Sequence, residues 1–303
     1  MTRIGELILN QSKKVLENKQ YAILCAVMLS IMPFASWLSV ALIALVTLRK
    51  GAKHGFEVLF PAAVIHSAPL MMLVPVESAL LNTVIAYVPC YFAALSLRKT
   101  TRWQAVSGVF FIQALIGFLL IQYALPNLAV EQFVHFKKML THYPEYQQFI
   151  ENSTQDVSSK DVAQLFLGIE ILGVVASALI SLLFARFIQA KLFVPGGLKS
   201  ELIEFRGGRF AFLILMGVSI ASYYEYAFAI NLLPLTLSYF LLTGFNLVYF
   251  VFARKWQIKT MVIMFLLIIL QPTFMLFTYI LFGLLDSLFN FRLYLPGRAR
   301  ESI

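Results

Sequence analysis

Several ionisable side chains lie within, or at the end of, long apolar stretches of this 303-residue chain, and three of them are the first candidates for chemistry. They are Glu170 in the segment 161–186, His66 in the segment 56–76, and Glu225 at the end of an apolar run. An unpaired charge at membrane depth costs about 3 kcal/mol, so such residues often mark ligand or proton sites. We treat all three as candidate ligand-binding residues and expect Glu170 to face the interior. Hydrogen bonds to a neighbouring helix, or headgroup contacts for Glu225, are the alternative.

Aromatic side chains accompany Glu225. Tyr223 and Tyr226 lie beside it in sequence, and Trp37 follows Pro33 in the first apolar segment. Helices that break near a polar rim are a recurrent way to build a binding site in a membrane protein. We therefore expect an outward-opening cavity bordered by Glu225, Tyr223, Tyr226 and the residues near Trp37. Anchoring of these rings at the membrane interface is the alternative.

Residues with the spacing of a catalytic or metal site are scarce. Glu131, His135 and His142 could approach one helix face, but Tyr143-Pro144 would end that helix and no further ligand is evident. The sequence contains no nucleophile–base pair, zinc-protease motif, Walker sequence or dinucleotide fingerprint. We expect neither an enzyme nor a resident metal or cofactor.

Small residues recur at four-residue spacing on two segments. One set is Ala22, Ala26 and Ser30, and the other is Gly173, Ser177, Ser181 and Ala185. Such faces allow helix backbones to approach closely. Packing inside the protein would explain both sets. Docking of a transmembrane partner on the first set is the alternative.

Two polar motifs stand between or after apolar segments. The first comprises Pro195, Gly196, Gly197, Glu201 and Arg206, and the second comprises Asp286 and Arg292. We expect Asp286 to pair with Arg206, and Arg292 to pair with Glu201 or Glu204. Such pairs would form a structural latch or, alternatively, a site that couples the protein to a partner.

The elements that position these residues are expected to be apolar helices. The chain is 60% hydrophobic and 13% charged, which cannot supply the surface of a soluble domain of this size. The predicted fold class is all-α, a polytopic transmembrane helical bundle. About eight apolar segments lie at 20–48, 56–76, 78–97, 104–126, 161–186, 210–230, 232–253 and 260–289. The first and last are too long for one crossing, so we expect them to split at Pro33 and Pro272.

Basic residues indicate the orientation. The 24 Lys and Arg residues cluster mainly between apolar segments, and such clusters stay in the cytoplasm of bacteria. We expect a cytoplasmic amphipathic segment at 1–20, a transmembrane domain at 21–289 and a cytoplasmic tail at 290–303. The loop 127–160 would face the periplasm and the loop 187–209 the cytoplasm. The net charge of +9 then reflects an inner-membrane topology and not nucleic-acid binding.

The two polar motifs also carry a resemblance. The chain resembles the YybS-like family of bacterial predicted inner-membrane proteins at two motifs. These are Arg186…Gln189…Pro195-Gly196-Gly197…Glu201…Phe205-Arg206 and Gly283-Leu-Leu-Asp286…Phe291-Arg292. Molecular function in that family is unassigned. The family is similar at fold level to the substrate-binding (S) components of energy-coupling-factor transporters. The resemblance therefore implies a partner-docking role for Ala22, Ala26 and Ser30. Asn290 stands where the family has an aspartate.

We expect an inner-membrane protein that binds a small molecule within its bundle and acts as a transport component without its own ATPase. The alternative is a non-transporting scaffold whose basic cytoplasmic loops recruit another protein. Expected partners are membrane lipids, an unknown small-molecule ligand and a possible transmembrane protein. A ligand within the bundle would favour the first function, and a filled bundle with an apolar patch on one face would favour the second.

Overall fold

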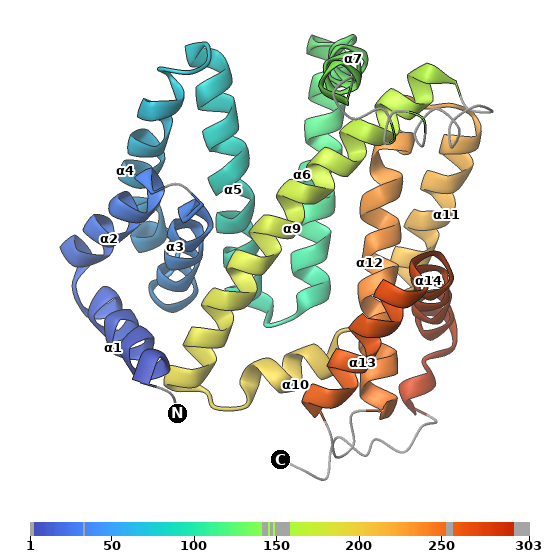
Figure 1. Cartoon of the computed structure of the whole chain (residues 1–303). Coiled ribbons are helices and arrows are strands. Elements are labelled where there is room, and N and C mark those ends of the chain that lie inside the picture. Colours follow the sequence, from blue (N-terminus) through green and yellow to red (C-terminus); the bar gives the residue numbers. More distant parts are fainter. Residues whose placement is uncertain are drawn as a thin grey trace. The chain divides into compact units, whose positions relative to one another are not determined.

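The computed structural model describes residues 3–32, 34–140, 145, 148, 158–252 and 257–293. Within these ranges every regular element is a helix (Figure 1). The elements are α1 (Arg3–Glu17), α2 (Lys19–Ile31), α3 (Ser36–Lys50), α4 (Ala52–Leu70), α5 (Val76–Thr100), α6 (Trp103–Ala124), α7 (Leu128–Leu140), α9 (Ser159–Phe193), α10 (Gly197–Glu204), α11 (Arg209–Tyr223), α12 (Ala227–Phe252), α13 (Gln257–Leu270), α14 (Pro272–Phe289) and the 3-10 helix η1 (Phe291–Leu293). The predicted all-α fold class is confirmed for this part of the chain.

Among the described residues, five helices are long and apolar enough to cross a membrane: α5, α6, α9, α12 and α14. They indicate a multi-pass membrane protein. Three other apolar helices, α2, α11 and α13, contain only 13, 15 and 14 residues. Each is about 20 Å long, against a hydrocarbon core of about 30 Å. The expected count of apolar segments is therefore not confirmed.

The first and last apolar segments are both divided where the sequence predicts. α2 and α3 are separate helices, and Phe34 between them has a left-handed backbone with φ 62°. α13 and α14 are separated at Gln271, and α14 starts with Pro272. Proline suits this first position because its missing N–H would have no helical acceptor there. Pro33 itself lies outside the described residues.

The chain divides into two compact units. Unit 1 comprises Met1–Phe110 and Gly173–Glu204, and unit 2 comprises Phe111–Leu172 and Phe205–Ile303. The helices α6 and α9 each contribute residues to both units. Every contact described below lies within one unit.

Small residues allow close packing of α2, α3, α4 and α5 in unit 1. Ala44 of α3 and Ala62 of α4 are fully buried. A Cβ added at Gly55 of α4 would overlap the hydroxyl of Thr47 on α3. Close backbones increase the van der Waals contact that holds helices together in a membrane.

In unit 2, α12 and α14 cross at two glycines. A Cβ added at Gly244 would overlap the carbonyl oxygen of Tyr279, and a Cβ at Gly283 would overlap that of Phe240. The two backbones are therefore in direct contact at this crossing. Phe118 of α6, which is 1% exposed, lies in a separate apolar core that joins α6, α7, α9, α11 and α12.

The segment 187–209, expected to connect two membrane segments, contains the end of one helix, a turn and a short second helix. α9 continues to Phe193, the chain turns at Pro195 and Gly196, and α10 follows. Gly196 has a left-handed φ of 85°, a conformation that glycine adopts without a steric penalty. No proline interrupts α9 before this turn, so the helix continues past its apolar part.

Candidate functional site

A polar cluster joins α2, α4 and α5 inside unit 1. The Nδ1 atom of His66 on α4 lies 3.0 Å from the carbonyl oxygen of Ser30 on α2. The His66 ring packs against the ring of Tyr87 on α5, with 5.2 Å between the centroids. His66 is half-buried, whereas Ser30 and Tyr87 are buried. One of the three ionisable candidates thus has partners on two other helices.

The break between α2 and α3 explains the contact to Ser30. The last carbonyl groups of a helix have no donor within that helix, and Ser30 lies in the last turn of α2. The imidazole of His66 supplies a donor for this carbonyl when Nδ1 carries the proton. The hydroxyl of Ser30 donates to the carbonyl of Val27, 2.7 Å away. The end of α2 is therefore satisfied by side chains.

Tyr87 carries a buried hydroxyl group within the cluster. Its side chain is 1% exposed, and its hydroxyl makes no hydrogen bond of normal geometry among the described residues, although the hydroxyls of Ser30 and Ser39 lie near it. The nearby hydroxyl of Ser39 donates to the carbonyl of Ala26, 2.8 Å away. A buried polar group without a partner costs about 1 to 3 kcal/mol. A bound polar molecule would remove this penalty.

The three residues lie at similar depths. Counted from the helix ends that carry basic residues, Ser30 lies about 16 Å along α2, His66 about 21 Å along α4 and Tyr87 about 20 Å along α5. With Nδ1 donating, Nε2 of His66 is an acceptor, while the Tyr87 hydroxyl is a donor. The cluster therefore offers one acceptor and one donor within the apolar part of the bundle.

The residues around the Pro195-Gly196-Gly197 turn form a second polar cluster in unit 1. Arg186 of α9 forms a bidentate ion pair with Glu201 of α10, and its Nε lies 3.1 Å from Glu201 Oε2. The indole N–H of Trp103 on α6 donates to the same carboxylate over 3.3 Å. α10 is thereby tied to both α9 and α6.

The second motif forms an ion pair within itself. The Nε of Arg292 donates to Oδ2 of Asp286 over 3.1 Å, and Asp286 is fully buried. Asn290 explains this local pairing, because its left-handed φ of 47° ends α14 and turns the chain back. Burial lowers the pKa of Arg292, and the carboxylate of Asp286 opposes that shift.

The expected pairing of Asp286 with Arg206 is wrong. Asp286 pairs with Arg292, and Glu201 pairs with Arg186. Arg206 contributes through its backbone, since its carbonyl accepts the Tyr239 hydroxyl over 3.2 Å. The turn at Gly196 brings Arg186 close to Glu201, and the turn at Asn290 brings Asp286 close to Arg292. Each residue therefore pairs with a partner that is near in sequence.

Glu170 is exposed, so packing within unit 2 does not support the expectation that it faces the interior. The buried side of α9 in unit 2 is formed by Ala163, Gln164 and Leu167. At about 100° per residue, Glu170 lies to one side of that stripe. Gly173, one turn further on, has nothing within 4 Å of an added Cβ. Packing therefore gives no support to a ligand-binding role for Glu170.

The outward-opening cavity stays a prediction. Tyr223, Glu225 and Tyr226 lie at the turn between α11 and α12 in unit 2, where Glu225 has a left-handed φ of 59°. Both tyrosines are exposed. Trp37 belongs to unit 1, where its ring packs against Phe184 with 5.7 Å between the centroids. Because the two groups belong to different units, their predicted proximity is not tested.

Ala22, Ala26 and Ser30 are buried inside unit 1. α2 packs against α3 and α4, and Ser39 of α3 bonds to the Ala26 carbonyl. The small-residue face therefore serves internal packing in this structure. A transmembrane partner would reach it only by displacing the protein's own helices.

Within the described ranges, no group of three or more His, Cys, Asp or Glu side chains is placed to hold a metal ion. His142, the last member of the weak metal pattern, lies outside those ranges. Sequence reasoning did not identify Tyr87 and Trp103 as polar partners. The sequence signal near Tyr87 is Pro89, two residues further on. A nearby proline does not show whether a tyrosine belongs to a binding site or anchors the helix at the membrane interface.

Comparison with known proteins identifies no relative. The chain matches no family model, no curated protein and no solved structure. The resemblance to the YybS-like family, and through it to transporter components, therefore stays a prediction. The interpretation of the site rests on its own geometry.

Proposed function

We propose that this protein is a bacterial inner-membrane component that binds a small polar molecule within its helices and serves a transport process powered by another protein. One observation carries the proposal: the buried hydroxyl of Tyr87, beside the ring of His66, makes no hydrogen bond of normal geometry among the described residues. Buried polar groups without a hydrogen-bond partner are rare in folded proteins because they are costly, and a bound ligand would supply the missing partner. The sequence has no Walker motif, which supports an external source of energy.

The chemistry of the cluster favours a neutral ligand. Ser30 and Tyr87 carry no charge, and a His66 that donates from Nδ1 alone is neutral as well. An ion bound there would lack a counter-charge, which is costly at membrane depth. The ligand would accept a hydrogen bond from Tyr87 and donate one to Nε2 of His66.

The same proposal includes a finer topology. The first and last apolar segments would each fold back at the breaks near Phe34 and Gln271, which places both termini in the cytoplasm. The short helices α2 and α13 support this arrangement, since helices of 13 and 14 residues are too short to span a core of about 30 Å unaided. Neighbouring helices would shield their ends.

Native mass spectrometry of the purified protein tests the binding role. We expect the wild-type protein to carry a non-covalent small molecule, and we expect Tyr87→Phe to retain about tenfold less, because one hydrogen bond contributes about 1 to 1.5 kcal/mol. Without ligand, Tyr87→Phe should unfold no more easily than the wild type, since the change removes an unsatisfied buried hydroxyl.

Tyr123→Phe is the matched control, because its side chain is 92% exposed. That variant should retain the small molecule like the wild type. Absence of any bound small molecule in the wild-type protein, or equal retention by Tyr87→Phe, would contradict the proposal.

A further inference from the structure

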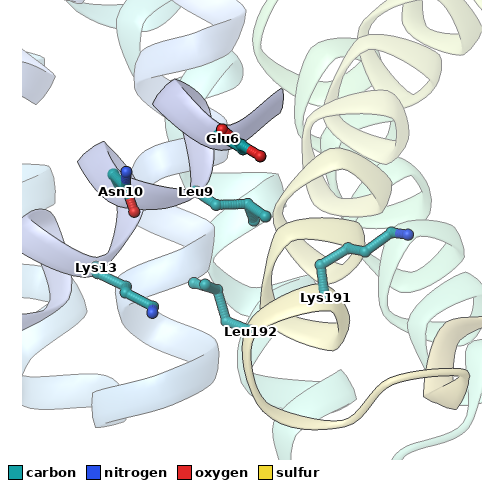
Figure 2. A pocket seen from close by; sticks show the side chains of 6 residues that line it. All are labelled: Glu6, Leu9, Asn10, Lys13, Lys191 and Leu192. Atoms are coloured by element: carbon teal, nitrogen blue, oxygen red, sulfur yellow. The ribbon is translucent and has the colours of Figure 1, made fainter. Parts of the chain in front are cut away.

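A pocket in unit 1 lies between α1 and the C-terminal end of α9 (Figure 2). Its volume is about 340 Å³. The lining residues are Glu6, Leu9, Asn10 and Lys13 of α1, and Lys191 and Leu192 of α9. Figure 2 shows Leu9 and Lys13 extending from α1 toward the end of α9. Each of the two helices thus contributes one lysine and one leucine.

The helix α1 has the character of an interfacial helix. Its Val15 and Leu16 are buried against unit 1, whereas Leu7 is 62% and Ile8 40% exposed. Exposed apolar side chains beside lysines are typical of a helix that lies in the headgroup region of a membrane. The pocket therefore lies where the acyl chains and headgroups of lipids would meet the protein.

The pocket belongs to the basic end of unit 1. Arg49, at the end of α3, lies over the ring of Phe193 at the end of α9, with 4.0 Å to the centroid. Lys50 follows directly, and α4 begins with Ala52 and Lys53. This end is the one that the basic residues assign to the cytoplasmic leaflet, whose anionic lipids attract such clusters.

The charges of the pocket walls favour an anion that also carries hydroxyl groups. Lys13, Lys191 and Glu6 form no ion pair among the described residues, so the lining carries two ammonium groups and one carboxylate. Figure 2 shows the Lys191 side chain directed away from α1. The ammonium group of Lys191 lies 5.7 Å from the centroid of the Phe187 ring. The carboxylate of Glu6 would accept hydrogen bonds from hydroxyl groups of a ligand, and Asn10 would donate or accept.

We propose that this pocket binds an anionic phospholipid with a glycerol-type headgroup. In the complex the exposed Lys191 side chain turns toward α1, so that the lipid phosphate lies between Lys13 and Lys191, and the headgroup hydroxyls bond to Glu6 and Asn10. The first acyl carbons lie along Leu9 and Leu192. This site is independent of the His66 cluster, and the variants that test it leave Tyr87 unchanged.

Titration of the detergent-purified full chain with phosphatidylglycerol, followed by native mass spectrometry, tests the proposal. Each of Lys13→Gln and Lys191→Gln should weaken binding about fivefold, because one cation near an anionic lipid contributes about 1 kcal/mol. The double variant should lose more than either single variant. Lys14→Gln is the matched control, because Lys14 lies on the same helix, is exposed and does not line the pocket.

Three further outcomes decide the identity of the ligand. Phosphatidylethanolamine should bind more weakly than phosphatidylglycerol, since its headgroup brings a third ammonium to the pocket and no hydroxyl. Inorganic phosphate should not displace the lipid at equal concentration. Unchanged phosphatidylglycerol binding by the double variant, an equal loss in Lys14→Gln, or displacement by free phosphate would each overturn the proposal.

Discussion

Arg186 and Glu201 form an ion pair that is largely shielded from solvent, since each side chain is 12% exposed. The substitution Glu201→Gln keeps the shape of the side chain but leaves the guanidinium group of Arg186 without its counter-charge. Breaking a buried pair from one side destabilises a protein by about 3 to 5 kcal/mol. We expect a loss at the lower end of that range, measured by reversible unfolding in detergent.

Glu204 provides the control for this prediction, because it lies on the same short helix and is exposed. The substitution Glu204→Gln should change the free energy of unfolding by less than about 0.5 kcal/mol. Equal effects of the two substitutions would show that the contribution of Glu201 comes from general surface charge and not from the ion pair.

The sequence singles out both His66 and Glu170, but only His66 has polar and ring contacts to other helices in the structure. Both residues are conspicuous by type, because ionisable side chains are rare in apolar segments. Their direction is harder to predict. A helix that is apolar on all sides has no hydrophobic period that marks its inner face, and α9 is such a helix around Glu170. The orientation of Glu170 is set by how α9 packs, which residue type does not encode.

At the scale of the elements, the crossing of α12 and α14 requires glycine. Substituting Gly244→Ala places a methyl group against the carbonyl oxygen of Tyr279, so the two helices must separate. Overpacking of this kind destabilises by about 1 to 3 kcal/mol, and we expect the upper end because the obstacle is backbone. Unfolding of the purified protein measures the loss.

Gly217 of α11 is the matched control for this substitution. An added Cβ there meets nothing within 4 Å. The substitution Gly217→Ala should leave stability unchanged or raise it by up to about 1 kcal/mol through helix propensity. Similar losses at both glycines would contradict a specific role for the α12–α14 crossing.

The ends of elements were predicted well where proline acts and poorly elsewhere. Pro272 begins α14 as expected, because the local chemistry of proline decides the break. The continuation of α9 to Phe193 was not expected, because polar residues near its end suggested a loop. Arg186 and Gln189 are compatible with a helix, and α9 ends only at Phe193, just before the turn at Pro195 and Gly196.

At the scale of the whole molecule, the topology is directly testable. In a variant with Cys25→Ala and Cys90→Ala, single cysteines are introduced by Ser153→Cys or Ser200→Cys. An impermeant maleimide applied to intact spheroplasts should label the cysteine at 153 but not the one at 200, since basic clusters remain in the cytoplasm. Ser153 lies outside the described residues, and Ser200 belongs to α10.

Membrane permeabilisation should then expose the cysteine at position 200 to the same reagent, which shows that this residue is reactive. Labelling of position 200 before permeabilisation, with position 153 protected, would reverse the orientation. That result would also contradict the placement of both termini in the cytoplasm.

The division into two compact units has no signal in the sequence. Residues 21–289 show no change of composition that marks a boundary. The reason is structural: α6 and α9 run from one unit into the other without interruption. Sequence patterns reveal domain borders through linkers, and a border that lies inside a helix has none.

Because unit 1 takes its last helices from Gly173–Glu204, its assembly is separated in time during synthesis. The ribosome releases α2 to α5 first and then makes all of α6, α7 and α9 before Glu201 can meet Trp103. At about 5 to 20 residues per second, this interval lasts several seconds. For that period Trp37 of α3 lacks the helix that later brings the hydroxyl of Ser181 to its carbonyl group. The protein therefore passes several seconds of its synthesis with unit 1 incomplete.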